Sequence, residues 1–89
     1  MLPSKYARKI LPLAVLPLDT PAQIMAINVS DCLKRRLLDL GFIPGTEIRA
    51  VFSSPFGDPR AYKIRGTLLA LRTDEAKSIL VRGLDTWLI

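Results

Sequence analysis

A chain of 89 residues with no histidine and a single cysteine, Cys32, has no imidazole to act as a base or as a metal ligand, and it has no internal disulfide. We therefore do not expect an enzyme. The length predicts one small domain, and hydrophobic residues, at 49% of the chain, are sufficient for its core. The net charge of +5 favours acidic partners such as a nucleic acid, an anionic membrane surface or an acidic protein face.

The chain opens with a polar, basic stretch, residues 1–9, which we expect to be mobile. The apolar run 10–18 imitates the hydrophobic region of a secretory signal. However, Pro12 and Pro17 would break a helix there, and the run is far shorter than the about 20 residues of a membrane span. We therefore predict an extended segment that lies against the domain, and we expect no transmembrane segment.

The first strand is predicted over residues 22–29, which are rich in Ile, Val and Met and follow Pro21. Ser30 and Asp31 then supply the N-cap of a helix, because either side chain can accept a hydrogen bond from a free amide of the first turn.

Three leucines at helical spacing give this helix one apolar stripe, formed by Leu33, Leu37 and Leu40. Gly41 stands where the helix would end in the left-handed conformation, and Phe42 follows where an apolar contact back to Leu37 is expected.

Residues 43–46 are typical of a type II turn, with Pro44 at its second position and Gly45 at its third. A second strand is predicted over residues 47–53. Its alternation places three apolar side chains on one face, Ile48, Ala50 and Phe52.

Turn-forming residues are dense over residues 54–59 and separate this strand from the next; they include Pro55, Gly57 and Pro59. Residues 61–65 alternate cleanly, with Tyr62 and Ile64 on one side and basic residues on the other. After Gly66 a further strand is predicted over residues 67–72.

A short helix capped by Thr73 is predicted next, with Asp74 and Glu75 in its first turn, and the last strand covers residues 79–82. These elements predict a mostly β fold with short helices. The expected architecture is a small, partly open barrel of about five strands, with one helix between strands 1 and 2 and a short helix before the last strand. The expected domain covers residues 10–83, between the basic N-terminus 1–9 and an apolar tail 84–89.

Three pieces of this sequence resemble a known family. Residues 36–48 read RLLDLGFIPGTEI and are similar to the helix–turn–strand signature of ferrous iron transport protein A, the FeoA family. SPFGDP at residues 54–59 and GTLLALR at residues 66–72 follow in the family's order. The resemblance implies an SH3-like barrel and a cytoplasmic accessory role beside FeoB, the ferrous iron transporter with a GTP-binding domain. The protein would then lie at the inner membrane through that partner.

The same barrel is also the C-terminal domain of the metal-dependent regulators related to the diphtheria toxin repressor. A metal-sensing or nucleic-acid-binding regulatory module is therefore the alternative. Nucleic acid is not the expected partner, because Phe42, Phe52 and Tyr62 fall at predicted core or turn positions instead of forming a stacking platform.

Basic residues of the predicted helix and strands could form a docking face for an acidic surface of the transporter; the candidates are Lys34, Arg35, Arg60, Lys63 and Arg65. The alternative interpretation is a solvated face that keeps a small protein soluble. Arg36 and Arg72 could join this face or connect helix and barrel.

No spacing of acidic residues suggests a metal site, so any ferrous or other transition-metal binding is expected to be weak or shared with a partner. The glycines are isolated, and turn geometry explains them better than phosphate binding does. The mean hydropathy of the whole chain is +0.27, and its two apolar segments, 10–18 and 84–89, could make contact with a second copy, so a homo-oligomer remains possible.

Overall fold

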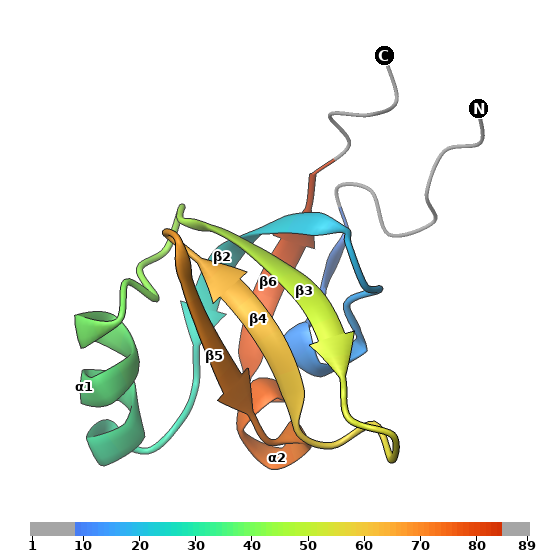
Figure 1. Cartoon of the computed structure of the whole chain (residues 1–89). Coiled ribbons are helices and arrows are strands. Elements are labelled where there is room, and N and C mark those ends of the chain that lie inside the picture. Colours follow the sequence, from blue (N-terminus) through green and yellow to red (C-terminus); the bar gives the residue numbers. More distant parts are fainter. Residues whose placement is uncertain (1–8, 85–89) are drawn as a thin grey trace.

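The computed structural model describes residues 9–84, so the predicted basic N-terminus and apolar tail lie outside it except for their residues 9 and 84. Six strands form one antiparallel sheet in the order β1-β6-β2-β3-β4-β5, and the sheet curls around the core (Figure 1). The strands are β1 (Ile10–Pro12), β2 (Pro21–Ile27), β3 (Glu47–Ser53), β4 (Arg60–Ile64), β5 (Thr67–Leu71) and β6 (Ile79–Gly83).

The predicted mostly β, partly open architecture is confirmed, with β1 and β5 as the two edges of the sheet in residues 9–84. The main helix, α1 (Asp31–Asp39), lies between β2 and β3, and the short helix α2 (Thr73–Ala76) precedes β6. The strand that the sequence did not predict is β1. It has only three residues and ends on a proline, which is too little for an alternating pattern.

The segment predicted to lie extended against the domain supplies part of its core. It pairs with β6 through β1 and then turns through a 3-10 helix, η1 (Leu13–Val15), instead of staying extended. Leu13 and Leu16 are fully buried. Burying a leucine side chain contributes about 1.5–3 kcal/mol, so this segment stabilises the fold substantially.

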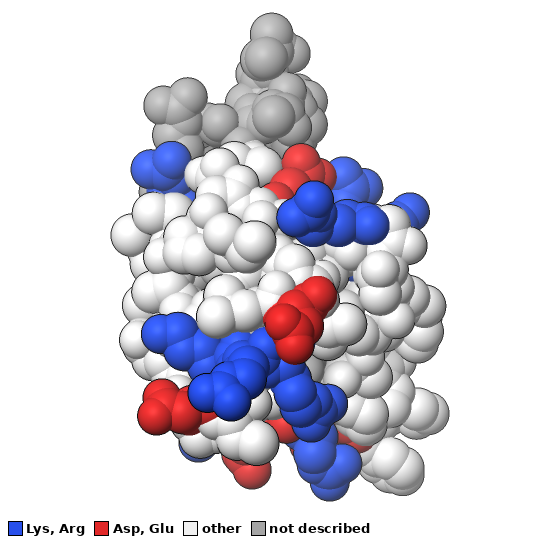
Figure 2. All heavy atoms as spheres, turned by 90° about the vertical axis from the view of Figure 1, so that its left-hand side faces the viewer, with Lys and Arg blue, Asp and Glu red and all other residues white. Residues whose placement is uncertain are grey.

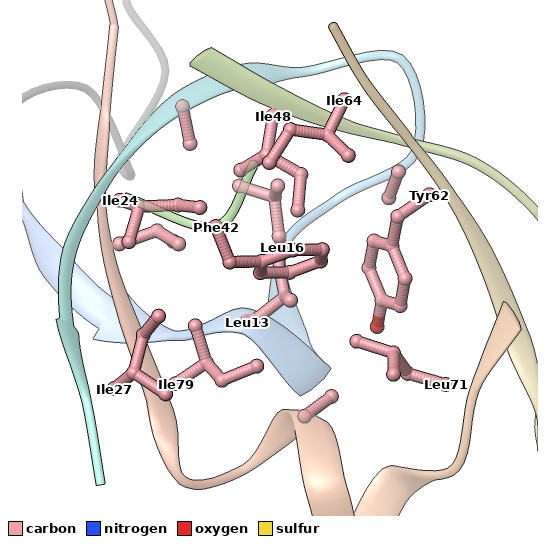
Figure 3. Packing of buried hydrophobic residues seen from close by; sticks show 14 of the residues in the cluster. Leu13, Leu16, Ile24, Ile27, Phe42, Ile48, Tyr62, Ile64, Leu71 and Ile79 are labelled. Atoms are coloured by element: carbon pink, nitrogen blue, oxygen red, sulfur yellow. The ribbon is translucent and has the colours of Figure 1, made fainter. Parts of the chain in front are cut away.

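The core centres on two aromatic rings, Phe42 and Tyr62, which are the largest fully buried side chains. Figure 3 shows them among aliphatic side chains that come from η1, from the residue that follows η1 and from the strands. The labelled ones are Leu13, Leu16, Ile24, Ile27, Ile48, Ile64, Leu71 and Ile79. The predicted burial of Phe42 and Tyr62 is therefore confirmed.

The prediction that Phe52 shares a face with Ile48 and Ala50 is wrong, since Phe52 is 54% exposed while the other two are fully buried. The pairing of β3 with β4 shifts between Ala50 and Phe52, so that Val51 is an extra residue in the ladder. Such a bulge ends the strict alternation of the strand. The side chain of Phe52 consequently points away from the face that Ala50 and Ile48 share.

The predicted cap of α2 is also wrong. Thr73 is the first helical residue, and Arg72 is the N-cap. The carboxylate of Glu75 accepts the N–H of Arg72 at 3.1 Å, while the N–H of Thr73 donates to Oδ1 of Asp58 at 2.9 Å. The distant Asp58 therefore accepts one of the free amides of the first turn, the N–H of Thr73 itself, and the side chain of Thr73 is not the cap.

Candidate partner-binding surface

Helix α1 presents three adjacent basic side chains to solvent, Lys34, Arg35 and Arg36, here called the α1 cations. The predicted N-cap is confirmed, because Oγ of Ser30 accepts the N–H of Leu33 at 3.4 Å. Leu37 is the helix's fully buried residue, while Leu33 is only partly buried and Leu40, at the C-cap, is 39% exposed. The helix therefore packs through one narrow side and exposes the rest.

The C-terminal end of α1 has the predicted geometry. Gly41 has φ +102°, and the N–H of Phe42 donates to the carbonyl of Leu37 at 2.9 Å. The next turn is closed by the N–H of Thr46, which donates to the carbonyl of Ile43 at 2.9 Å around Pro44 and Gly45. This sequence of helix end and turn fixes where α1 lies relative to β3.

A second group of basic side chains lies on the outer face of β3 and β4. Arg49 of β3 is directly opposite Lys63 of β4, and Arg65 follows in the turn to β5. We call these three the hairpin cations. They border a hollow of about 500 Å³ that is also lined by Asp19 and Glu47.

The charges of the hairpin cations are only partly balanced. Like charges directly opposite each other in a sheet repel. The ion pair between Arg49 and Glu47 is 3.9 Å long and exposed, so solvent screens most of its attraction. An anionic group placed beside Arg49 and Lys63 would relieve this repulsion.

Arg65 extends from the hairpin cations to the C-terminal end of α1. The hairpin turn holds its backbone at φ +49°, and its Cδ lies 2.7 Å from the position that a Cβ on Gly41 would occupy. The stem of Arg65 therefore crosses the end of α1. Viewed from the side of α1, basic side chains gather in two groups with a mostly uncharged surface between them (Figure 2).

Arg60 does not join these groups. Its guanidinium donates to the backbone carbonyls of Ala14 and Leu16 and lies 5.6 Å from the centre of the Tyr62 ring. This side chain ties β4 to the η1 segment. We therefore leave Arg60 out of the candidate surface. Of the residues that the sequence suggested, four remain: Lys34, Arg35, Lys63 and Arg65.

Arg49 is the surface residue that the sequence reasoning missed. The signal was present, because the alternation of residues 47–53 places Arg49 on the face opposite Ile48 and Ala50. What the sequence lacked was the register that brings Arg49 opposite Lys63.

Within residues 9–84, histidine, cysteine, aspartate and glutamate nowhere gather in a group of three that could hold a metal ion. The same part of the chain contains no helix long and apolar enough to span a membrane.

The exposed aromatics Phe52 and Phe56 lie at the end of the β3–β4 hairpin opposite to Arg65, away from the hairpin cations.

A family model, the FeoA domain, matches residues 11–83. The chain belongs to the FeoA family. Its sequence is 31% identical to the FeoA protein of Chlorobium tepidum, with a TM-score of 0.80 over 83% of this chain and 70% of that one. No curated protein matches the chain.

The FeoA of Stenotrophomonas maltophilia, solved in complex with zinc, is 37% identical, with a TM-score of 0.71 over 80% of this chain and 88% of that one. It is described as a prokaryotic SH3 domain protein and a candidate ferrous iron transport activating factor. The fold of this FeoA-family chain is therefore SH3-like, as the resemblance implied.

A manganese-dependent transcriptional repressor shares the fold at 15% identity, with a TM-score of 0.75 over 94% of this chain and 44% of that one. Membership of the FeoA family connects the chain with ferrous iron transport.

Proposed function

We propose that this chain is a non-enzymatic accessory protein of bacterial ferrous iron uptake that binds the cytoplasmic part of an FeoB-type transporter. It acts in the cytoplasm and reaches the inner membrane through that partner. The observation that carries the proposal is the FeoA domain match over residues 11–83. The α1 cations and the hairpin cations support it, because they give a protein of net charge +5 a face suited to an acidic partner.

The binding itself is tested with the soluble GTP-binding domain of the transporter and this chain, by titration calorimetry at low and high salt. We expect a complex whose affinity falls as salt rises, because exposed charges act mainly on the rate of association and are screened by salt. Absence of a complex at low salt would contradict the proposal.

The role of the α1 cations is tested by the double variant Lys34→Glu/Arg35→Glu. Both side chains are exposed, so the variant should fold, and it should bind the domain about tenfold more weakly, which corresponds to about 1.4 kcal/mol. The matched control is Lys77→Glu/Arg82→Glu, which makes the same change in net charge at two exposed residues, one at the C-cap of α2 and one on β6. If the control weakens binding equally, net charge and not the α1 surface decides the affinity.

The second candidate is a metal-sensing or nucleic-acid-binding regulatory module, favoured by the shared fold of the manganese-dependent repressor. Fluorescence anisotropy with labelled single- and double-stranded oligonucleotides in low salt distinguishes the two. The accessory role predicts a flat titration, with and without ferrous iron, whereas saturable binding would favour the regulatory module.

A further inference from the structure

The strand β5 forms one edge of the sheet and pairs with β4 alone. Arg65 and Gly66, both at positive φ, make the two-residue turn between these strands, so that Ile64 and Thr67 are the closing pair. Hydrogen-bonded and non-hydrogen-bonded pairs alternate from there. The N–H and C=O groups of Leu68 and Ala70 therefore point away from β4, towards the open side of the sheet.

This edge lacks the usual protection against a further strand. Thr67–Leu71 contains no charged residue and no proline, and Leu68 is 57% exposed. Natural sheets usually guard their edges with lysines, prolines, bulges or very short strands. The opposite edge, β1, follows that rule, since it has three residues and Pro12 has no N–H to donate. Among the strands of residues 9–84, β5 is the edge that offers a free and regular row of backbone groups.

The charges beside β5 indicate what kind of strand would fit there. Lys63 is directly opposite Leu68, and Arg49 is directly opposite Lys63, so the outer face carries a row of two cations leading up to the edge. A residue added next to Leu68 would lie about 10 Å from Lys63, two strand spacings away, which a lysine and a glutamate side chain together can span. In the view of Figure 1, α1, which carries the α1 cations, lies on the same side as β5.

We propose that the free edge of β5 binds an extended acidic segment of the partner as an additional strand. Its backbone pairs with Leu68 and Ala70, and its carboxylates meet Lys63, while Arg49 beyond Lys63 adds to the positive charge of the outer face. A second copy of this chain fits less well, because pairing two β5 edges would bring together two proteins of net charge +5 and two sets of hairpin cations. The inference deepens the proposed function and rests on it for the identity of the partner.

The edge is tested directly with a short peptide in which glutamate alternates with valine, by NMR titration of the full-length ¹⁵N-labelled chain. Strand addition predicts that the amides of Leu68 and Ala70 shift and exchange more slowly with solvent, because they acquire hydrogen bonds. A peptide with lysine in place of glutamate should not bind. Equal binding of both peptides, or binding without protection of these two amides, would overturn the proposal.

Substitutions in β5 separate strand addition from attraction by charge alone. Leu68→Glu places a negative charge against the acidic strand and should weaken binding at least tenfold, whereas Leu68→Gln, of similar size, should stay within about threefold. Ala70→Pro removes an outward N–H that β4 does not use, so the sheet should remain intact while binding falls. If Ala70→Pro is unstable, the comparison of the two Leu68 variants still decides, and equal affinities for them would refute the inference.

The same variants are then titrated with the transporter's GTP-binding domain. Loss of binding by Leu68→Glu but not by Leu68→Gln supports both the edge and the partner. If the wild type binds the domain and neither substitution weakens this binding, the proposed function stands and the proposed role of β5 is wrong. If the acidic peptide protects the amides of Leu68 and Ala70 but the domain does not bind, β5 remains a binding site for acidic strands and the proposed partner is wrong. Sedimentation of the free chain as a dimer that Leu68→Glu disrupts would favour a second copy over the acidic segment.

Discussion

Tyr62 places a polar group inside an otherwise hydrophobic core. Its ring is fully buried, and its hydroxyl is a buried side-chain polar atom without a hydrogen-bond partner in residues 9–84. Burial raises the pKa of the Tyr62 hydroxyl above its ordinary value of 10.0, and the nearby guanidinium of Arg60 opposes this rise. The same guanidinium donates to the carbonyls of Ala14, in η1, and of Leu16, which follows it.

Tyr62→Phe is expected to leave the fold intact and to raise the free energy of unfolding by up to about 1 kcal/mol, because an unpaired buried hydroxyl costs about 1–3 kcal/mol and the ring packing is retained. Urea unfolding at pH 7 measures this. A loss of more than about 1 kcal/mol would mean that the hydroxyl has a partner in the folded protein.

The same pair of proteins tests the pKa of Tyr62. The folded-state pKa lies above the unfolded one, so ionisation of Tyr62 leaves stability unaffected below pH 10.0 and lowers it as the pH rises from there through the folded-state pKa. The wild type should therefore lose stability relative to Tyr62→Phe in alkaline solution. Other titrating groups affect both proteins alike, so the difference between them reports on Tyr62.

At the scale of elements, the end of α1 is where helix and sheet are fitted together. Gly41 combines a positive φ with the close approach of the Arg65 stem, and Phe42 next to it fills the core. The α1 cations and the hairpin cations keep their relative positions only if this junction is intact. Any other residue at position 41 would both strain the backbone and displace the side chain of Arg65.

Gly41→Ala should therefore lower the free energy of unfolding by more than Gly57→Ala, the matched control. Both glycines have positive φ, at +102° and +83°, so each substitution carries a backbone cost of about 1 kcal/mol. Only at position 41 would the new methyl group also meet another side chain, since nothing lies near it at position 57. Thermal unfolding of both variants gives the comparison.

Adding Arg65→Ala to Gly41→Ala should recover part of the loss, because the shorter side chain removes the clash. Equal destabilisation by Gly41→Ala and Gly57→Ala would show that the contact with Arg65 contributes nothing to the junction.

At the scale of the whole molecule, the sequence predicted the elements that local signals mark. Ser30 and Gly41 delimit α1, and the turn at Pro44 and Gly45 precedes a strand whose predicted bounds, 47–53, are those of β3. Elements defined by contacts distant in sequence were not predicted. β1 exists because it pairs with β6, and the first turn of α2 donates the N–H of Thr73 to Asp58, fifteen residues earlier.

The candidate surface was predictable to the same extent. Exposure of Lys34 and Lys63 followed from helical and strand periodicity. The bulge at Val51 that exposes Phe52, and the use of Arg60 as a backbone clamp, depend on strand pairing and on the position of η1, which no local pattern encodes. The free edge of β5 is likewise a property of the sheet order and not of the strand's own residues.

The N-terminal segment gives a final prediction about the domain as a cooperative unit. Leu13 of η1 is fully buried against the barrel, whereas Val15 in the same turn is 54% exposed. Leu13→Ala should cost about 2–5 kcal/mol, a large share of the about 5–15 kcal/mol that stabilises a domain, and the wild type should still unfold in one transition. Val15→Ala, the control, should change stability by less than about 0.5 kcal/mol.

Urea unfolding followed by two probes, far- and near-ultraviolet circular dichroism, distinguishes the two ways in which η1 could contribute. If η1 is part of the core, Leu13→Ala shifts both transitions together to lower urea with an unchanged slope. If η1 only covers a barrel that is stable without it, Leu13→Ala and Val15→Ala unfold alike. A surface built on β4 and β5 depends on the first result, because Arg60 holds the start of β4 to the carbonyls of this same segment.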